Sequence, residues 1–353
     1  LKQNEGNYNE ILESQTDENN NLYVSGFFSG DSFGGNIAFN GTSNNSVSFL
    51  EMDGIFIAKY SSLGELIWAI PIYESGFASI DSRLSLSIDD NGALYLGGSY
   101  SGSITLDPNS QNIVLSSTDS SDDSFIAKFD TDGNFLWVKE LKGTNNVNIV
   151  SLHLSENGPG VFATGHFNQN IFLDEDDDSS QFISNGFDDV FIASYTSSGD
   201  YLWGKSFGSN SSDNAAALLV DSNNDLIALG SFTGTIDVGD DTNPFTLTSQ
   251  AFRDNYIIKF NTNGDPIWSK QIEDSVVING AVTDTDGTIL MVGSFSDNQD
   301  FDPSSNVFEI QSNNNQNDAF LLSLSTEGIF NWVSVFGGNS TDLGTALTLD
   351  EDN

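Results

Sequence analysis

The five tryptophans of this 353-residue chain stand at nearly equal intervals, at positions 68, 137, 203, 268 and 332. Each follows a glycine by four residues and comes shortly after an apolar segment such as Phe56-Ile57-Ala58-Lys59-Tyr60. That segment recurs, with the same spacing as the tryptophans, at Phe125, Phe191, Tyr256 and Phe320. A mean period of about 66 residues indicates one structural unit repeated five times, because self-similarity at a fixed period is the signature of repeat architectures.

The second unit shows the internal pattern most clearly. Leu84, Leu86 and Ile88 alternate with serines, which is typical of a strand, and residues 89–92 (Asp-Asp-Asn-Gly) predict a turn. Further strands are expected at 93–100, 124–129 and 134–139, with a variable loop before the third strand and a tight turn at 130–133. Nothing has helical periodicity. The pattern predicts an all-β chain, a β-propeller whose blades are four-stranded antiparallel sheets.

We place the repeats at approximately 7–74, 75–143, 144–208, 209–273 and 274–337, with the start of a sixth unit at 338–353. The chain is thus expected to be a single propeller domain or a fragment of one, with partial units at both ends. Since a ring needs its last blade completed, we expect an excerpt of a larger propeller, of about six to eight blades. The weaker alternative is five blades that close irregularly.

The charge restricts the partners. Ten Lys and Arg residues stand against 51 Asp and Glu, which gives a net charge of -41. Such a polyanion is repelled by nucleic acid and by anionic lipid headgroups. The 27 Phe residues give too much buryable surface for a disordered chain. Without cysteine there is no disulfide framework and no thiolate metal site, and no apolar run approaches the length of a membrane span.

At the repeated motifs the chain resembles a known family. Residues 89–102 follow a D-x-x-G-x-L-Y pattern with later glycines, 53–60 read D-x-F-I-A-K-Y with one insertion, and 133–137 read G-x-x-x-W. These motifs resemble the bacterial β-propeller repeat family (SBBP-type, seven-bladed), in its variant with D-F-D-P loops, here at 301–303 and 106–108. The third and fourth copies depart from that loop motif. The resemblance implies an exported or cell-surface bacterial protein in which the propeller is a binding or display module.

A tryptophan and a lysine recur at fixed positions of the repeat. The tryptophans (Trp68, Trp137, Trp203, Trp268, Trp332) could form an aromatic surface for glycans, but recurrence at one position favours packing between blades. Lys59, Lys128 and Lys259 share one position in the third strand, where the other copies have Ser194 and Ser323. We expect each lysine to pair with a turn aspartate or to stack on the neighbouring tryptophan strand, as a structural rather than a catalytic group.

Acidic loops are the candidates for a cation site. Asp174, Asp176 and Asp178 alternate in a run of acids, which hard cations such as Ca²⁺ prefer, and weaker versions occur at Asp237, Asp240, Asp241, Asp300 and Asp302. The spacing matches no EF-hand or nonapeptide repeat. A solvated loop tip is the more ordinary interpretation, so no cofactor is expected beyond a possible calcium ion.

Three functions fit this sequence. The first is a non-catalytic module that binds protein or glycan at the bacterial surface through the variable loops. The copies are nearly equivalent, which favours this function, because an enzyme would be expected to break the symmetry of the repeats. The second is a glycan-cleaving enzyme that uses paired carboxylates from different blades. The third is a structural component of a larger surface assembly. Neither nucleic acid nor direct membrane insertion is expected for any of them.

Overall fold

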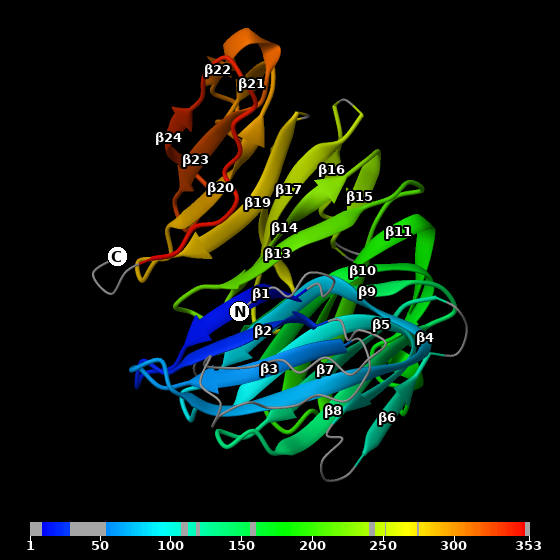
Figure 1. The fold of residues 1–353 in the computed structure, drawn as a ribbon. Coiled ribbons are helices and arrows are strands. Elements are labelled where there is room, and N and C mark those ends of the chain that lie inside the picture. Colours follow the sequence, from blue (N-terminus) through cyan, green and yellow to red (C-terminus); the bar gives the residue numbers. More distant parts are fainter. Residues whose placement is uncertain are drawn as a thin grey trace. The chain divides into compact units, whose positions relative to one another are not determined.

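The computed structural model describes residues 9–28, 54–106, 112–117, 121–155, 160–239, 244–250, 252–273 and 275–349. Within these ranges the chain is all-β apart from two single-turn 3-10 helices, η1 (Asp178–Ser180) and η2 (Asn313–Asn315). No helix in the described part is long and apolar enough to cross a membrane. The all-β prediction is therefore confirmed. Figure 1 shows the arrangement of the strands.

Each repeat is built from four antiparallel strands, which we call A to D in chain order. The A strands are β1 (Asn9–Thr16), β9 (Val147–Leu154), β13 (Asn214–Val220) and β19 (Val276–Thr283). The B strands are β2 (Leu22–Phe28), β5 (Leu94–Leu106), β10 (Gly160–Phe172), β14 (Leu226–Phe232) and β20 (Ile289–Phe295). The C strands are β3 (Gly54–Tyr60), β7 (Asp123–Phe129), β11 (Gln181–Thr196), β17 (Asp254–Phe260) and β23 (Asp318–Leu324). The D strands are β8 (Phe135–Gly143), β12 (Tyr201–Phe207), β18 (Pro266–Ile272) and β24 (Phe330–Phe336).

One strand serves two repeats. β4 (Leu66–Ile88) is the D strand of the first repeat and continues without a break into the A strand of the second. It pairs with β5 along most of its length, with register shifts between Ser75 and Ser79 and between Ile80 and Leu84. The sequence predicts two separate strands here, because the alternation of Leu84, Leu86 and Ile88 stops upstream. Backbone pairing with the long strand β5 keeps β4 extended between its first and second halves.

The expected variable loop between strands B and C also contains regular structure. In the second repeat the end of β5 pairs with β6 (Ile113–Ser116). In the fourth, β15 (Thr235–Asp237) pairs with β16 (Thr246–Thr248), and in the fifth, β21 (Asn298–Asp300) pairs with β22 (Glu309–Gln311). The third repeat extends β10 and β11 instead. We call these segments the B–C hairpins.

The chain divides into two compact units, and each is described by itself. The first comprises residues 1–156, 170–181 and 196–201, and the second comprises 157–169, 182–195 and 202–353, so the division runs through the third repeat. In the second unit the strand order is β13-β14-β17-β18 in the fourth repeat and β19-β20-β23-β24 in the fifth. Residues 338–349, where a sixth unit is expected to start, contain no strand.

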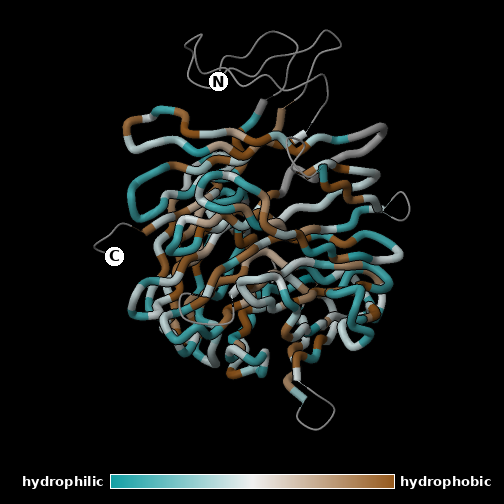
Figure 2. The backbone as a smooth tube through the Cα atoms, turned by 90° about the horizontal axis from the view of Figure 1, so that it is seen from below, coloured by the Kyte–Doolittle hydropathy of each residue, from teal (hydrophilic) through white to brown (hydrophobic). Residues whose placement is uncertain are grey.

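Neighbouring sheets share one hydrophobic core. In the first unit Tyr23 and Ile57 of the first repeat cluster with Leu94, Leu96 and Phe129 of the second. In the second unit residues of the fourth repeat such as Ile227 cluster with Met291 and Phe320 of the fifth. Apolar strand segments alternate with hydrophilic turns along the coloured, described part of the chain (Figure 2). Each shared core thus buries the facing sides of two neighbouring repeats, as stacked repeats require.

The tight turns between strands C and D place a glycine against the preceding repeat. Gly133, Gly199, Gly264 and Gly328 all have positive φ, and a Cβ at each would lie 2.8–3.0 Å from the nearest tryptophan ring atom of the repeat before it. The equivalent Gly64, in the first repeat, has φ +76°, and no atom lies within 4 Å of its Cβ position. The positive φ favours glycine in all five turns. A tryptophan ring lies close to the glycine in only four of them, those at Gly133, Gly199, Gly264 and Gly328.

This difference provides a matched test. We expect Gly264→Ala to lower the free energy of unfolding by about 2–4 kcal/mol, since it combines the positive φ with overpacking against Trp203. Gly64→Ala, with nearly the same φ but open space, is expected to lose about 1 kcal/mol. Urea titration of both variants measures the two values. Equal losses would show that the tryptophan contact contributes nothing.

Candidate functional site

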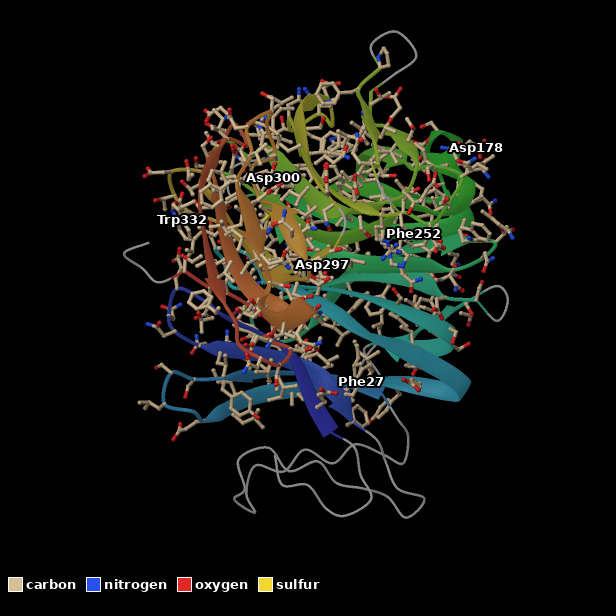
Figure 3. All side chains as sticks on the ribbon, turned by 90° about the horizontal axis from the view of Figure 1, so that it is seen from above. Phe27, Asp178, Phe252, Asp297, Asp300 and Trp332 are labelled. Atoms are coloured by element: carbon tan, nitrogen blue, oxygen red, sulfur yellow. The ribbon has the colours of Figure 1, made fainter. Side chains whose placement is uncertain are left out.

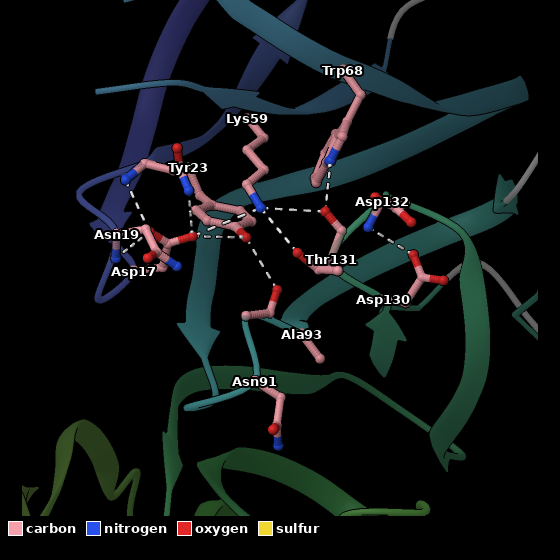
Figure 4. A network of polar contacts seen from close by, with 12 residues as sticks. Asp17, Asn19, Tyr23, Lys59, Trp68, Asn91, Ala93, Asp130, Thr131 and Asp132 are labelled. Atoms are coloured by element: carbon pink, nitrogen blue, oxygen red, sulfur yellow. Dashed lines mark hydrogen bonds and ion pairs between the residues drawn. The ribbon is translucent and has the colours of Figure 1, made fainter. Parts of the chain in front are cut away.

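The most elaborate polar site in the described chain lies at the junction between the first and second repeats (Figure 4). Three side chains stand in one row across the first sheet, because Tyr23 pairs with Lys59 and Lys59 with Trp68 in the strand register. The Lys59 ammonium lies 4.8 Å from the centre of the Tyr23 ring, and the Trp68 ring meets Tyr23 edge-on at 5.9 Å between centroids. The row is therefore a cation–π and aromatic stack.

The row binds the C–D turn of the second repeat. The Trp68 indole N–H donates to the Thr131 carbonyl at 3.1 Å, and Lys59 Nζ donates to the Thr131 hydroxyl at 3.0 Å. The Tyr23 hydroxyl donates to the Gly92 carbonyl at 3.0 Å, in the A–B turn of the same neighbour. The hydroxyl, ammonium and indole N–H groups of Tyr23, Lys59 and Trp68 are thus hydrogen-bonded. The apolar parts of these side chains can therefore be buried without leaving a polar group unsatisfied.

The same indole bond recurs at all four successive junctions. Trp137 donates to the Ser197 carbonyl at 3.2 Å, Trp203 to the Thr262 carbonyl at 3.0 Å, and Trp268 to the Thr326 carbonyl at 3.1 Å. In each case the acceptor is the second residue of the next C–D turn. The structure thus places four of the five predicted tryptophans between repeats, and Trp332 on the outer strand β24, exposed (Figure 3).

The three lysines contact aspartates of the A–B turn in their own repeats. Lys59 lies 3.7 Å from Asp17, Lys128 lies 3.4 Å from Asp89, and Lys259 lies 2.6 Å from Asp221. The Lys259 and Asp221 side chains are 7% and 0% exposed. The aromatic partner of Lys59 and Lys128 is a tyrosine of strand B rather than the tryptophan strand, with Lys128 4.5 Å from the Tyr95 ring centre.

Those aspartates also hold their turns. Asp17 accepts hydrogen bonds from the backbone N–H groups of Asn19 and Asn21, and Asp221 accepts them from Asn223 and Asp225. Burial by itself would raise the pKa of Asp17, but the hydrogen bonds from Asn21 and Asn19 and the charge of Lys59 outweigh it and bring the pKa below its usual value. The carboxylate form is therefore part of the folded turn.

The acids of the loop at 174–178, the candidate calcium ligands of the sequence, make separate contacts in the structure. Asp174 forms an ion pair with Lys139 at 3.0 Å and accepts the backbone N–H of Asp176, while Asp178 begins helix η1. Asp177 is the N-cap residue of that helix, and its carboxylate accepts the Ser179 N–H. Among the described residues no three His, Cys, Asp or Glu side chains come together as metal ligands. Two of the acids in this loop thus serve as an ion-pair partner and a helix cap.

The lesser acidic positions follow the same rule. Asp237 and Asp300 occupy equivalent places in the fourth and fifth B–C hairpins, and each accepts two backbone N–H groups across its hairpin loop. Asp302 accepts the N–H of Ser304. Asp240 and Asp241, together with the Asp107–Pro108 pair, lie outside the described residues.

One buried acid has a strongly shifted pKa. Asp189, at the start of the apolar part of β11, is 1% exposed and accepts the Asn185 N–H through one oxygen, while its other oxygen has no hydrogen-bond partner. Burial, with repulsion from Asp213 and Asp188, raises the pKa of Asp189 to about 6. A shifted carboxyl can indicate catalysis, but this one is closed off from solvent, so a substrate cannot reach it.

Sequence reasoning missed two parts of the site. They are Tyr23 and Tyr95 as members of the row, and the Ser or Thr residues whose carbonyl groups accept the indole hydrogen bonds. The second feature had a signal, because residues 131, 197, 262 and 326 all stand two positions before the turn glycine. The first had none, since only two of the B strands carry tyrosine at that position: the equivalents in the fourth and fifth repeats are Ile227 and Leu290.

The ion pairs generate one prediction. Replacing Lys259 by Met leaves Asp221 buried without its cation, which we expect to cost about 3–5 kcal/mol of unfolding free energy. The same change at Lys128, whose Asp89 partner is 23% exposed, is expected to cost about 1 kcal/mol. Denaturant unfolding of both variants at low salt gives the comparison. A smaller loss at Lys259 than at Lys128 would contradict this assignment.

Asp189 gives a pH-dependent prediction. Between its ordinary value of 3.8 and about 6, the side chain is protonated when folded and ionised when unfolded, so its contribution to stability falls as pH rises through this window. Asp189→Asn removes the ionisation and should gain stability relative to the parent between pH 4 and pH 7. Thermal unfolding across that range tests it, with exposed Asp176→Asn as the control. A constant difference at every pH would refute the assignment.

Comparison with known proteins adds one distant relative. The chain is 22% identical, over 339 residues, to an uncharacterized WD repeat-containing protein, L264, of Acanthamoeba polyphaga mimivirus. The match covers 80% of this chain and 24% of that protein, so the chain spans about a quarter of the relative's length. No family model matches the sequence. Together with the four-stranded antiparallel units, this similarity indicates a repeat protein of the β-propeller type.

Proposed function

We propose that the repeats form a β-propeller of the bacterial SBBP type, and that this propeller is a non-catalytic binding or display module of an exported surface protein. The repeated indole-to-turn junction supports the propeller, because it joins each sheet face to face with the next in the same way. The motifs at 89–102 and 133–137 support the family and, through it, the location outside the bacterial cell.

The observation that carries the binding function is a set of exposed apolar side chains on the B–C hairpins of the second, third and fifth repeats and, in the fourth, on the link between β16 and β17. They are Val114, Ile183, Phe187, Phe252, Val307 and Phe308. Phe252 and Ile183 are 80% and 71% exposed, respectively. Large apolar side chains held out on loops above a rigid sheet are typical of surfaces that bind protein or glycan.

Two features favour this module over a glycan-cleaving enzyme. A glycosidase needs two carboxylates that face a substrate across an open pocket. The acid with the most strongly raised carboxyl pKa among the described residues, Asp189, is closed off from solvent, and the exposed acids of the hairpins serve as turn caps.

The test combines a binding screen with loop variants. The chain is screened on a glycan array and against surface-exposed bacterial proteins, and any ligand is then measured against Phe252→Ser and against Ile183→Ser with Phe187→Ser. We expect at least a tenfold loss of affinity, about 1.4 kcal/mol or more, for changes that remove hot-spot aromatics. Ile267→Ser, an equally apolar change on strand D of the fourth repeat, should bind normally.

Two outcomes would count against the module. Binding that is unchanged in every hairpin variant would move the site elsewhere on the chain. Turnover of a glycan substrate in a parallel hydrolase screen, retained by the hairpin variants, would favour the enzyme.

A further inference from the structure

Two exposed phenylalanines stand at the same position in successive repeats. Phe187 in the third repeat and Phe252 in the fourth each come two residues before the buried aspartate that begins the apolar part of strand C. Their side chains are 62% and 80% exposed. The second and fifth repeats have Ser121 and Gln316 at this position, so the fold itself does not require an aromatic ring here.

The loop between β12 and β13, residues 208–213, lies beside the first of these phenylalanines. The backbone N–H of Asp213 donates to the carbonyl of Asp188, the residue after Phe187, at 2.7 Å. The Asn185 side-chain amide donates to the first carbonyl of the loop at 3.2 Å. Both ends of the loop are thus fixed to the strand that carries Phe187.

The same loop borders the second phenylalanine. The Asp213 carboxylate accepts the backbone N–H of Thr233 at 2.9 Å, and the Thr233 hydroxyl donates to the Phe252 carbonyl at 2.9 Å. All of these residues belong to the second compact unit. The segments that carry the two phenylalanines are therefore joined through one hydrogen-bonded loop, and they form a continuous surface with it.

Arg253 supplies a positive charge at this surface. It follows Phe252, and its side chain is exposed. The ion pairs of the described chain all use lysine, so none of them holds the Arg253 guanidinium. Burial raises the pKa of Asp213, and the nearby charge of Arg253 acts in the opposite direction. A guanidinium has five N–H donors in a planar fork, so Arg253 can donate to the oxygens of a ligand.

Further polar groups accompany the guanidinium. Asp188 is partly buried, and one of its carboxylate oxygens accepts a hydrogen bond from the Asn168 amide at 3.3 Å. Asn210, in the loop 208–213, is exposed, and its amide carries both a donor and an acceptor. The surface thus combines two phenyl rings with hydrogen-bond donors and acceptors, the composition of a site for a polar ligand with an apolar face.

The charges at this surface select the class of ligand. Asp188, Asp189, Asp213 and Asp254 lie at or beneath it, in a chain with a net charge of -41, so a polyanion would be repelled. A polycation would place its charge against Arg253. A neutral hexose avoids both penalties. Its C–H groups can pack on the electron-rich face of a phenyl ring, and its hydroxyls both donate to carboxylate oxygens and accept from a guanidinium.

We propose that Phe187, Phe252 and Arg253 form a binding site for neutral hexose units of a glycan, beside the loop 208–213. This inference rests on the binding function proposed above and narrows it, because it names a glycan rather than a protein as the ligand. It also assigns the site to the third and fourth repeats. Val307, which is exposed on the hairpin of the fifth repeat, lies outside it.

Isothermal titration calorimetry with neutral hexasaccharides is the test. The probes are the hexamers of glucose, mannose and galactose, with the hexamer of galacturonic acid as their charged counterpart. At least one neutral probe should bind, and Phe187→Ala and Phe252→Ala should each weaken that binding about tenfold or more. Val307→Ala removes an equally exposed apolar side chain and should bind like the parent. Circular dichroism and the melting temperature show that each variant is folded.

Arg253 separates a neutral ligand from a charged one. Arg253→Gln removes the charge but keeps hydrogen-bond donors, so a neutral hexasaccharide should lose less affinity with this variant than with Arg253→Ala. Its affinity should also be the same at low salt and at about 1 M salt, where the Debye length falls to about 3 Å. The affinity of an acidic or a basic ligand would change with salt.

Three results would overturn the inference. They are a parent that binds none of the neutral probes, binding that is unchanged in both Phe187→Ala and Phe252→Ala, and tighter binding of the galacturonic acid hexamer than of every neutral probe. The proposed function fails separately. A protein ligand without any glycan would overturn the inference and support the binding module, whereas a chain that binds neither protein nor glycan would overturn both.

Discussion

The structure depends on one contact between neighbouring repeats. A tryptophan ring packs against the turn glycine of the next repeat, and the indole N–H donates a hydrogen bond to the carbonyl of the residue two positions before that glycine. A single four-stranded sheet has two apolar faces and cannot bury both by itself. The junction orients the next sheet so that the faces meet, as Trp203 does through Gly264 and Thr262. It also satisfies the one polar atom of the tryptophan, which would otherwise be costly to bury.

This contact explains where the chain places its acids and its few bases. Carboxylates such as Asp17 and Asp221 hold turns by accepting backbone N–H groups, and these turns lie beside the junction. The buried lysines neutralise them from the adjacent strand. Much of the net charge of -41 is thus spread over turns and hairpin loops, where it serves local geometry. A charge used in this way is no evidence for a basic partner.

The sequence was sufficient to predict the repeats, because a period of about 66 residues and the alternation of apolar side chains are local signals. It did not predict that β4 would run unbroken from Leu66 to Ile88, since strand continuity there comes from pairing with β5 rather than from alternation. The B–C hairpins were expected as loops because their strands are only three or four residues long, too short to show a hydrophobic period. Proximity in sequence likewise suggested that Asp174, Asp176 and Asp178 share a cation, whereas one forms an ion pair and another starts a helix.

The contact between Trp203 and the glycine turn can be tested most directly with a double-mutant cycle. Urea unfolding free energies are measured for the parent, Trp203→Ala, Gly264→Ala and the double variant. If the ring and the turn glycine are in contact, alanine at position 264 costs less once Trp203 is gone, and a coupling energy of about 1–2 kcal/mol results. Additive losses, with the same cost for alanine at position 264 in both backgrounds, would contradict the account.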